Sequence, residues 1–199
     1  GGNRELALMV TVLSNSLTVL LTPFILERAV GATVQFNTSA MVLRMILIVL
    51  LPILIGQLLR PKLWGRTQSI RPALKIMPQL IILLFVYAGF ASGADTLRQG
   101  GELLVRFLVA CIALHAILLS VMAVVSGILK LSGPDRTAVI ICGSQKTLPN
   151  GVYIWSHFFP TNPYGAVPLV LYHLFQLIVD TLLVSKFEKL NGMKKVDKY

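Results

Sequence analysis

The chain has 199 residues, of which 55% are hydrophobic and 13% charged, and its formal net charge is +10. Its mean hydropathy of +0.77 excludes an ordinary soluble domain and indicates an integral membrane protein. The distribution of the positive charge does not indicate a nucleic-acid partner, because the basic residues collect between apolar runs and are not interleaved with aromatic residues. The expected surroundings of the chain are therefore a lipid bilayer.

Six apolar runs are long enough to cross a hydrocarbon core of about 30 Å. They cover approximately residues 5–26, 39–59, 71–92, 103–129, 136–158 and 165–186. We predict an all-α transmembrane domain over residues 1–186, followed by a basic tail over residues 187–199. The 60–75 loop has five basic residues and no acidic one, and the tail is rich in lysine, whereas the alternate loops are nearly neutral. The positive-inside rule then places the C-terminus in the cytoplasm, with a plasma or inner membrane as the expected location.

The first span is unusually polar for a segment flanked by leucines. Thr11, Asn15 and Thr18 follow an i, i+4, i+7 pattern, so they share one helix face. This face either lines a binding site or makes ordinary hydrogen bonds to neighbouring helices.

The fifth span contains a polar break. From Arg136, at its edge, to Lys146 is about 15 Å of helix, or half of the hydrocarbon core, so Lys146 should lie near the midplane. Pro149, Asn150 and Gly151 are expected to break the helix just beyond it. A broken polar helix at this depth is tolerated only where protein or a water-filled cavity covers it, which is typical of a transport site.

Lys146 is expected to face the bundle interior and to have a partner, since a charge at mid-depth is costly. Its ammonium could bind an anionic substrate, take the place of a metal cation or carry a proton; the alternative is a structural role against carbonyls of the broken helix. Ser144, Gln145 and Thr147 surround it with groups that can coordinate Na⁺. A second half-helix, expected to begin near Asn150, would point its positive end inward.

In the sixth span, His173, Gln176 and Asp180 recur at i, i+3, i+7 and share a face. Asp180 is a candidate carboxylate for a proton or a cation, with structural pairing as the alternative. His115, isolated in the fourth span, is interpreted as a hydrogen-bonded structural histidine.

The sequence does not favour an enzyme and calls for no organic cofactor. It has no metalloprotease motif, no nucleophile-elbow motif and no pair of carboxylates at one depth. An intramembrane hydrolase that uses Ser144 with His115 or His173 remains an alternative on residue types alone.

Three stretches carry a family resemblance. Gly2-Asn3, followed by Thr11 and Leu21-Thr22-Pro23, resembles the start of the fifth helix of the bile acid:sodium symporter family. The stretch from Cys142 to Leu148, with Gly151 after it, is similar to that family's unwound ninth helix, and most closely to the branch with a Ser-x-Lys-Ser/Thr-Leu core there. Pro168-Leu169, Tyr172-His173 and Gln176 are similar to the last helix of that branch.

The resemblance implies a ten-helix fold of two inverted five-helix repeats, in which the broken fourth and ninth helices cross near the substrate and sodium sites. This chain would hold the end of helix four and helices five to ten, as the C-terminal portion of a longer protein. The absent N-terminal helices would then be partners of the chain, and a small organic anion its substrate.

The resemblance also implies roles for single residues. Thr11 and Gln145 fall on sodium-ligand positions, whereas Ile141 stands where a sodium-binding glutamate is expected and Ala7 where a serine ligand is expected. Our hypothesis is that the Lys146 ammonium replaces a bound Na⁺. The full set of predicted substrate- and ion-binding residues is Thr11, Gly143, Ser144, Gln145, Lys146, Thr147, Asn150, His173 and Gln176.

The predicted function is secondary active transport of an organic anion, coupled to Na⁺ or H⁺. The alternative from another class is a membrane protein that no longer transports and acts through partners, for example in regulating ion homeostasis.

Overall fold

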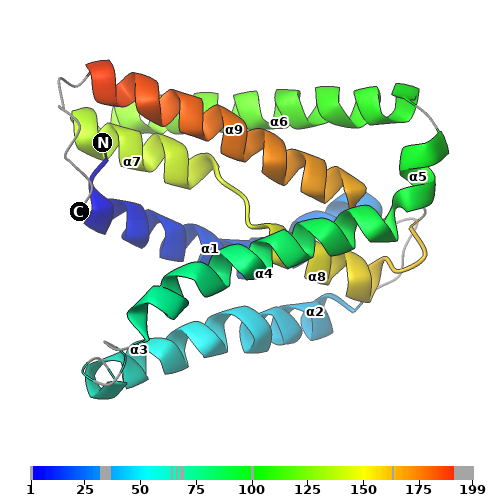
Figure 1. Ribbon diagram of the computed structural model, residues 1–199, viewed down its shortest axis with the longest axis horizontal. Helices are drawn as coiled ribbons and strands as arrows, with labels where there is room; N and C mark the ends of the chain where they lie inside the picture. Colours follow the sequence, from blue (N-terminus) through cyan, green and yellow to red (C-terminus); the bar gives the residue numbers. More distant parts are fainter. Residues whose placement is uncertain are drawn as a thin grey trace. The chain divides into compact units, whose positions relative to one another are not determined.

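The computed structural model describes residues 2–31, 37–63, 65, 67, 70–99, 101–162 and 164–190. Over these ranges the secondary structure is helical, with no strand (Figure 1). The elements are α1 (Arg4–Val30), α2 (Thr38–Met45), η1 (Ile46–Leu50), α3 (Leu51–Leu63), α4 (Arg71–Ser92), α5 (Ala94–Gln99), α6 (Gly101–Ile128), α7 (Gly133–Ser144), α8 (Leu148–Phe158) and α9 (Val167–Leu190).

These helices confirm the predicted all-α membrane fold. Within the described ranges, five are long and apolar enough to cross a membrane, namely Arg4–Ala29, Thr38–Leu63, Arg71–Ser92, Gly101–Ile128 and Val167–Phe187. The predicted fifth span is the α7–α8 pair, of 12 and 11 residues. Each half alone covers only about half of the hydrocarbon core.

The spanning helices expose their apolar side chains. Leu58, Leu83 and Ile128, for example, are 75%, 63% and 73% exposed. Such an extensive apolar surface would be unfavourable in water and is what contact with lipid chains requires. The polar groups that the helices do bury are therefore the informative ones.

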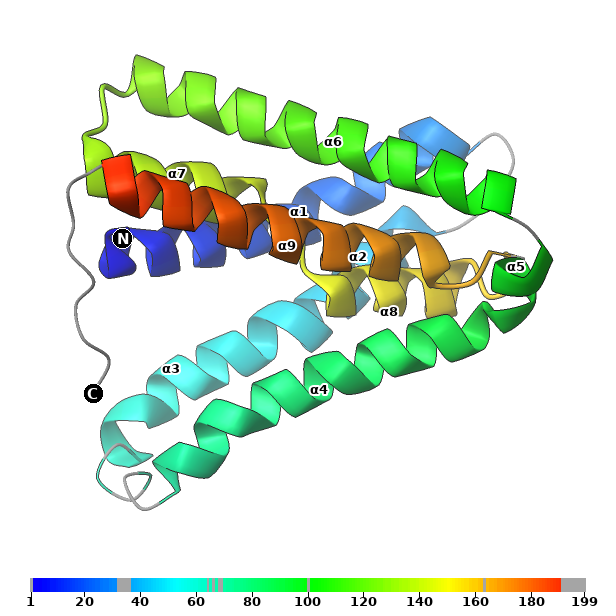
Figure 2. The same cartoon turned by 45° about the horizontal axis from the view of Figure 1, so that its top comes forward.

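Two compact units divide the chain, one formed by Gly1–Thr11 with Ile82–Tyr199 and the other by Val12–Ile81. In the second unit, α2, η1 and α3 follow one another without a gap from Thr38 to Leu63 (Figure 2). The π-helical turn η1 ends two residues before Pro52, whose ring nitrogen cannot donate a helical hydrogen bond, so a local change of helical pitch is expected there. Residues 191–199 of the predicted tail and Arg66 of the basic loop lie outside the described residues.

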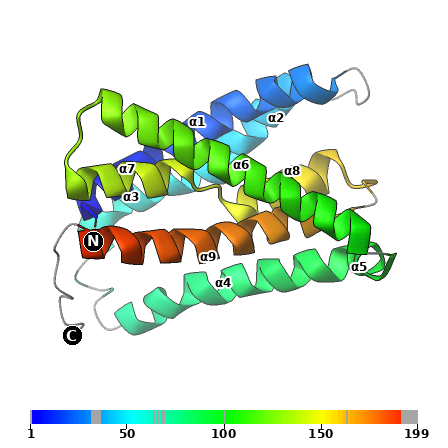
Figure 3. The same ribbon diagram turned by 90° about the horizontal axis from the view of Figure 1, so that it is seen from above.

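The first unit is built around α6, α7 and α9, which pack against one another (Figures 2 and 3). Ala138, Val139, Ile140 and Ile141 of α7 are all buried, as is Val170 of α9. Because four consecutive residues of α7 are buried, this half-helix is enclosed on several sides. It therefore presents its C-terminal end to the interior of the unit.

The C-terminal end of α4 and the residue that follows it approach α9 at two glycines. A Cβ added at Gly89 would collide with Val170, and one added at Gly93 would collide with Val167. Gly127 of α6 has open space around it instead. Close contact between these helices therefore depends on the absence of a side chain at 89 and 93.

Gly89→Ala should accordingly destabilise the protein by about 1–3 kcal/mol, the usual cost of overpacking. Gly127→Ala, the matched control, should be neutral or stabilising by up to about 1 kcal/mol, because alanine is the better helix former. Thermal unfolding of the purified protein in detergent measures both. Equal stability of the two variants would contradict the packing described.

Candidate functional site

The break in the fifth span lies between α7 and α8. Helix α7 ends at Ser144, Gln145 and Thr147 have extended backbone angles (φ/ψ of −68°/143° and −83°/123°), and α8 begins at Leu148 (Figure 1). The predicted break at residues 149–151 is wrong by a few residues. Pro149 lies in the first turn of α8 instead of ending a helix, since proline in a first turn lacks only an N–H that has no helical partner there. Lys146 consequently lies in the extended stretch itself.

Gln176 of α9 binds the backbone of the break on both sides. The Lys146 N–H donates to Gln176 Oε1 at 3.1 Å, and Gln176 Nε2 donates to the Lys146 carbonyl at 2.8 Å. Gln176 Nε2 also lies 3.2 Å from His173 Nδ1, so both protons of this amide have acceptors. Gln176 is 2% exposed. One buried side chain thus supplies the hydrogen bonds that the unwound backbone lacks.

A second buried network joins the break to α6 and α9. Gln145 Nε2 donates to Asp180 Oδ2 at 2.8 Å, and His115 Nε2 lies 3.1 Å from Asp180 Oδ1. The His115 and Asp180 side chains are 1% and 5% exposed. Because a carboxylate only accepts, His115 Nε2 carries a proton, and in the neutral ring Nδ1 accepts from the Tyr172 hydroxyl at 3.4 Å. Both oxygens of this buried carboxylate therefore have donors.

Lys146 exposes its side chain, in contrast to the expected orientation towards the interior. Among the described residues no ion pair joins its ammonium to a carboxylate, so the predicted charged partner is not found there. Its main chain is anchored by Gln176 while its side chain extends outward.

The other predicted residues of the break have distinct environments. Ser144 is fully buried and donates its hydroxyl to the Ile141 carbonyl at 3.0 Å. Gly143 lies against the Met122 side chain, which would have to shift to accommodate a Cβ. Thr147 is the N-cap residue of α8 but makes no side-chain capping bond, and Asn150 lies half-buried in the first turn of α8.

Thr11 and His173 lie beside the break. The Thr11 side chain is next to the Cys142 thiol of α7, and its hydroxyl donates to the Ala7 carbonyl at 2.8 Å. His173 is 8% exposed, and its Nε2 has no hydrogen-bond partner within the described part of the chain. The structure thus gathers all the predicted site residues around one break.

Sequence reasoning missed the His115–Asp180 pair. The i, i+3, i+7 pattern placed Asp180 on a face with His173 and Gln176, but His115 is 65 residues away in sequence and no local pattern connects them. The interpretation of His115 as a hydrogen-bonded histidine agrees with its two contacts. The hydrolase alternative gains no support, because Ser144 donates to its own helix and His115 is engaged by Asp180 and Tyr172.

These features define an all-α integral membrane protein with a broken span that is anchored by its neighbours. Residues 1–189 match the SBF-like CPA transporter family, and the chain belongs to that family. The bile acid:sodium symporter resemblance predicted from the sequence is thereby confirmed.

Curated relatives agree with this assignment. "Putative symporter YfeH" of Escherichia coli (strain K12) is 28% identical over 195 residues, covering 95% of this chain and 58% of the relative. "Probable sodium/metabolite cotransporter BASS4, chloroplastic" of Arabidopsis thaliana is 30% identical, covering 93% and 46%. "Sodium/bile acid cotransporter 7" of Mus musculus is 22% identical, covering 92% and 56%. The chain spans about half the length of the curated relatives it matches, and no solved structure matches it.

Gln176→Met should destabilise the protein by about 1–3 kcal/mol, because it leaves the part-buried N–H and carbonyl of Lys146 unsatisfied. Thr181→Ala is the control on the same helix, since Thr181 is exposed and bonds only to the Leu177 carbonyl. Thermal unfolding in detergent gives the stability, and hydrogen exchange at residues 145–147 locates the loss. Unchanged exchange at the break in Gln176→Met would contradict the anchoring role.

A double-mutant cycle tests the pairing of His115 with Asp180. His115→Phe and Asp180→Leu should each destabilise, and the double variant should be less destabilised than the sum of the two by about 0.5–3 kcal/mol. The coupling is expected because either single change leaves the other buried polar group without its partner. Additive losses of unfolding free energy would show that the two side chains act independently.

Proposed function

We propose that this chain is the C-terminal part of a secondary active transporter that moves a small organic anion across a membrane, coupled to Na⁺ or H⁺. The observation that carries the proposal is the break at residues 145–147. It lies between two half-helices in a membrane-spanning bundle, and its main chain is held by Gln176 while the Lys146 side chain is left exposed.

The chemistry of the break suits an anion. Helix α8 begins at Leu148, and the N–H groups of its first turn have no partners within the helix. The N-terminal end of a helix carries a partial positive charge, and Lys146 adds a full one two residues earlier. In the names of the relatives, bile acids and metabolites are the transported species, which also supports an organic anion as the substrate.

The second part of the proposal concerns the cation whose gradient drives transport. Two relatives are named as sodium cotransporters, and by resemblance Thr11 and Gln145 are at sodium-ligand positions. Ile141 is buried in α7 at the position where a sodium-binding glutamate is expected. A gained cation at 146 beside a lost anion at 141 supports replacement of one bound Na⁺ by the Lys146 ammonium. Transport would then need fewer sodium ions, or be driven by protons.

Family membership and loop charges support two further parts of the proposal, namely the helices that would complete the site and the orientation in the membrane. Helices that precede this chain in a longer protein would supply the second broken helix, which would cross α7–α8 and complete the site. The basic 60–75 loop supports a cytoplasmic C-terminus in a plasma or inner membrane. Both the preceding helices and the orientation are proposed from family membership and from the loop charges.

Lys146→Ala is expected to reduce uptake of radiolabelled organic anions by at least about tenfold, because a charge-assisted bond to the substrate is lost. The measurement is uptake by the full-length protein in proteoliposomes, with and without Na⁺ and proton gradients. Lys75→Ala, at an exposed lysine of α4, is the matched control and should transport normally.

Two outcomes would overturn parts of this proposal. Stoichiometric Na⁺-dependent uptake that Lys146→Ala leaves unchanged would refute replacement of Na⁺ by the ammonium. Absence of uptake under every gradient, with a folded protein, would favour the alternative of a membrane protein that acts through partners.

A further inference from the structure

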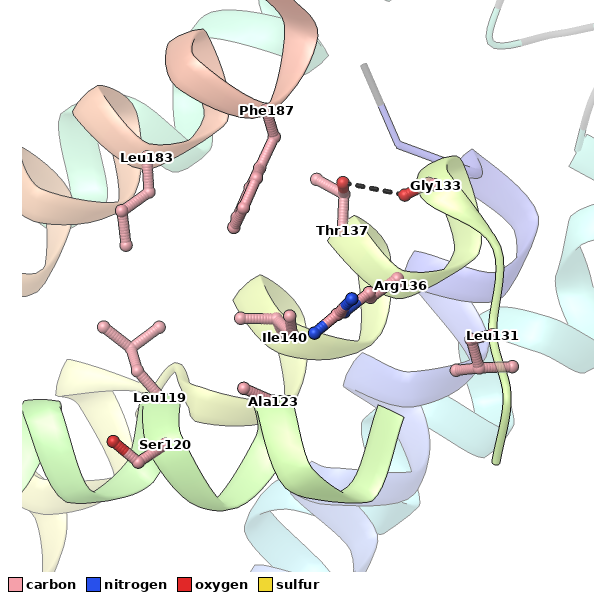
Figure 4. Close-up of a pocket in the computed structure, with 10 residues that line it drawn as sticks. All are labelled: Leu119, Ser120, Ala123, Leu131, Gly133, Arg136, Thr137, Ile140, Leu183 and Phe187. Carbon is pink, nitrogen blue, oxygen red and sulfur yellow. Dashed lines mark hydrogen bonds between the residues drawn. The ribbon is translucent and has the colours of Figure 1, made fainter. Parts of the chain in front are cut away.

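A cavity lies between α6, α7 and α9, away from the break. Its volume is ≈570 Å³, within the range of about 300–1,000 Å³ that is typical of small-molecule sites. Figure 4 shows that its walls come from all three helices, with Leu119 and Ala123 on α6, Ile140 on α7, and Leu183 and Phe187 on α9. The lining is therefore mainly apolar.

The polar lining residues differ in how their side chains are satisfied. The Ser120 hydroxyl donates to the Ala116 carbonyl at 2.7 Å, and the Thr137 hydroxyl donates to the Gly133 carbonyl at 2.9 Å. Arg136 has no side-chain partner within the described part of the chain, and Figure 4 shows its guanidinium extending towards Ile140 and Ala123. Adjacent Asp135 accepts a bond from Asn3 at 2.9 Å. The cavity thus presents one cation without a counter-charge against an apolar wall.

The depth of these groups matches one leaflet of a bilayer. Arg136 belongs to the first turn of α7, whose edge is predicted to lie at the cytoplasmic interface. Leu119 lies nine residues before the end of α6 at Ile128, so the apolar wall reaches roughly 13 Å inward. A cation at the expected depth of the headgroups, with an apolar wall at the depth of the acyl chains, is complementary to an amphipathic anion.

We propose that this cavity binds an anionic phospholipid, with its phosphate on Arg136 and one acyl chain between α6 and α9. Basic pockets between transmembrane helices on the cytoplasmic side are suited to anionic headgroups. The break at Gln145 is nine residues along α7 from Arg136, or about 13 Å, so the cavity is separate from the proposed transport site. The guanidinium can donate two parallel hydrogen bonds to a phosphate, which gives a preference over zwitterionic lipid.

The test is a lipid titration followed by native mass spectrometry of the full-length protein in detergent. Dioleoyl phosphatidylglycerol should bind at about tenfold lower concentration than dioleoyl phosphatidylcholine. Arg136→Gln should abolish this preference and Arg136→Lys should retain part of it. Ala123→Phe, which fills the cavity, should weaken binding of both lipids.

Two controls separate the site from general charge effects. Arg44→Gln removes one exposed arginine from another helix and should keep the full preference. Glycerol 3-phosphate offers a glycerol-linked phosphate without acyl chains and should not displace phosphatidylglycerol. An unchanged preference in Arg136→Gln, an equal loss in Arg44→Gln, or displacement by glycerol 3-phosphate would each overturn the proposal of a lipid site.

Discussion

The two hydrogen bonds between Gln176 and the Lys146 backbone are the interaction on which the broken span depends. Where a helix unwinds inside a bilayer, no water replaces its lost hydrogen bonds, and each unsatisfied group costs several kcal/mol. A glutamine amide has one acceptor and two donors, so it can pair with the N–H and the carbonyl of the same residue. This pairing fixes where the break lies along α7–α8 and which neighbour it faces.

The His115–Asp180 pair extends that anchoring to a third helix. Its carboxylate accepts from α6 through His115 and from the break through Gln145, so one buried acid links three elements. A buried acid is costly unless its oxygens have donors, and here both do. Gln176 and Asp180 of α9 are consequently engaged in holding the break, whose own Gln145 side chain turns towards Asp180 while that of Lys146 is exposed.

Two cations of the first unit, Lys146 and Arg136, therefore have different environments. Lys146 lies in an extended stretch between half-helices, where the partial positive charge at the start of α8 adds to its own. Arg136 lies at the opposite end of α7, beside an apolar cavity. The transport that we propose from family membership gives the first cation a role. The second follows only from the packing of α6, α7 and α9.

The sequence by itself determined the six spans, the polar break and the family. A bilayer demands about 20 apolar residues per crossing, so polar residues within such a run are easily recognised. The sequence placed the break a few residues late, since proline can start a helix as well as end one. Only the tertiary structure decided that His115 meets Asp180 and that Gln176, not a charged group, holds Lys146. The first contact joins residues 65 positions apart and the second joins residues 30 positions apart. They meet because of how the helices are rotated when they pack, which no local sequence pattern indicates.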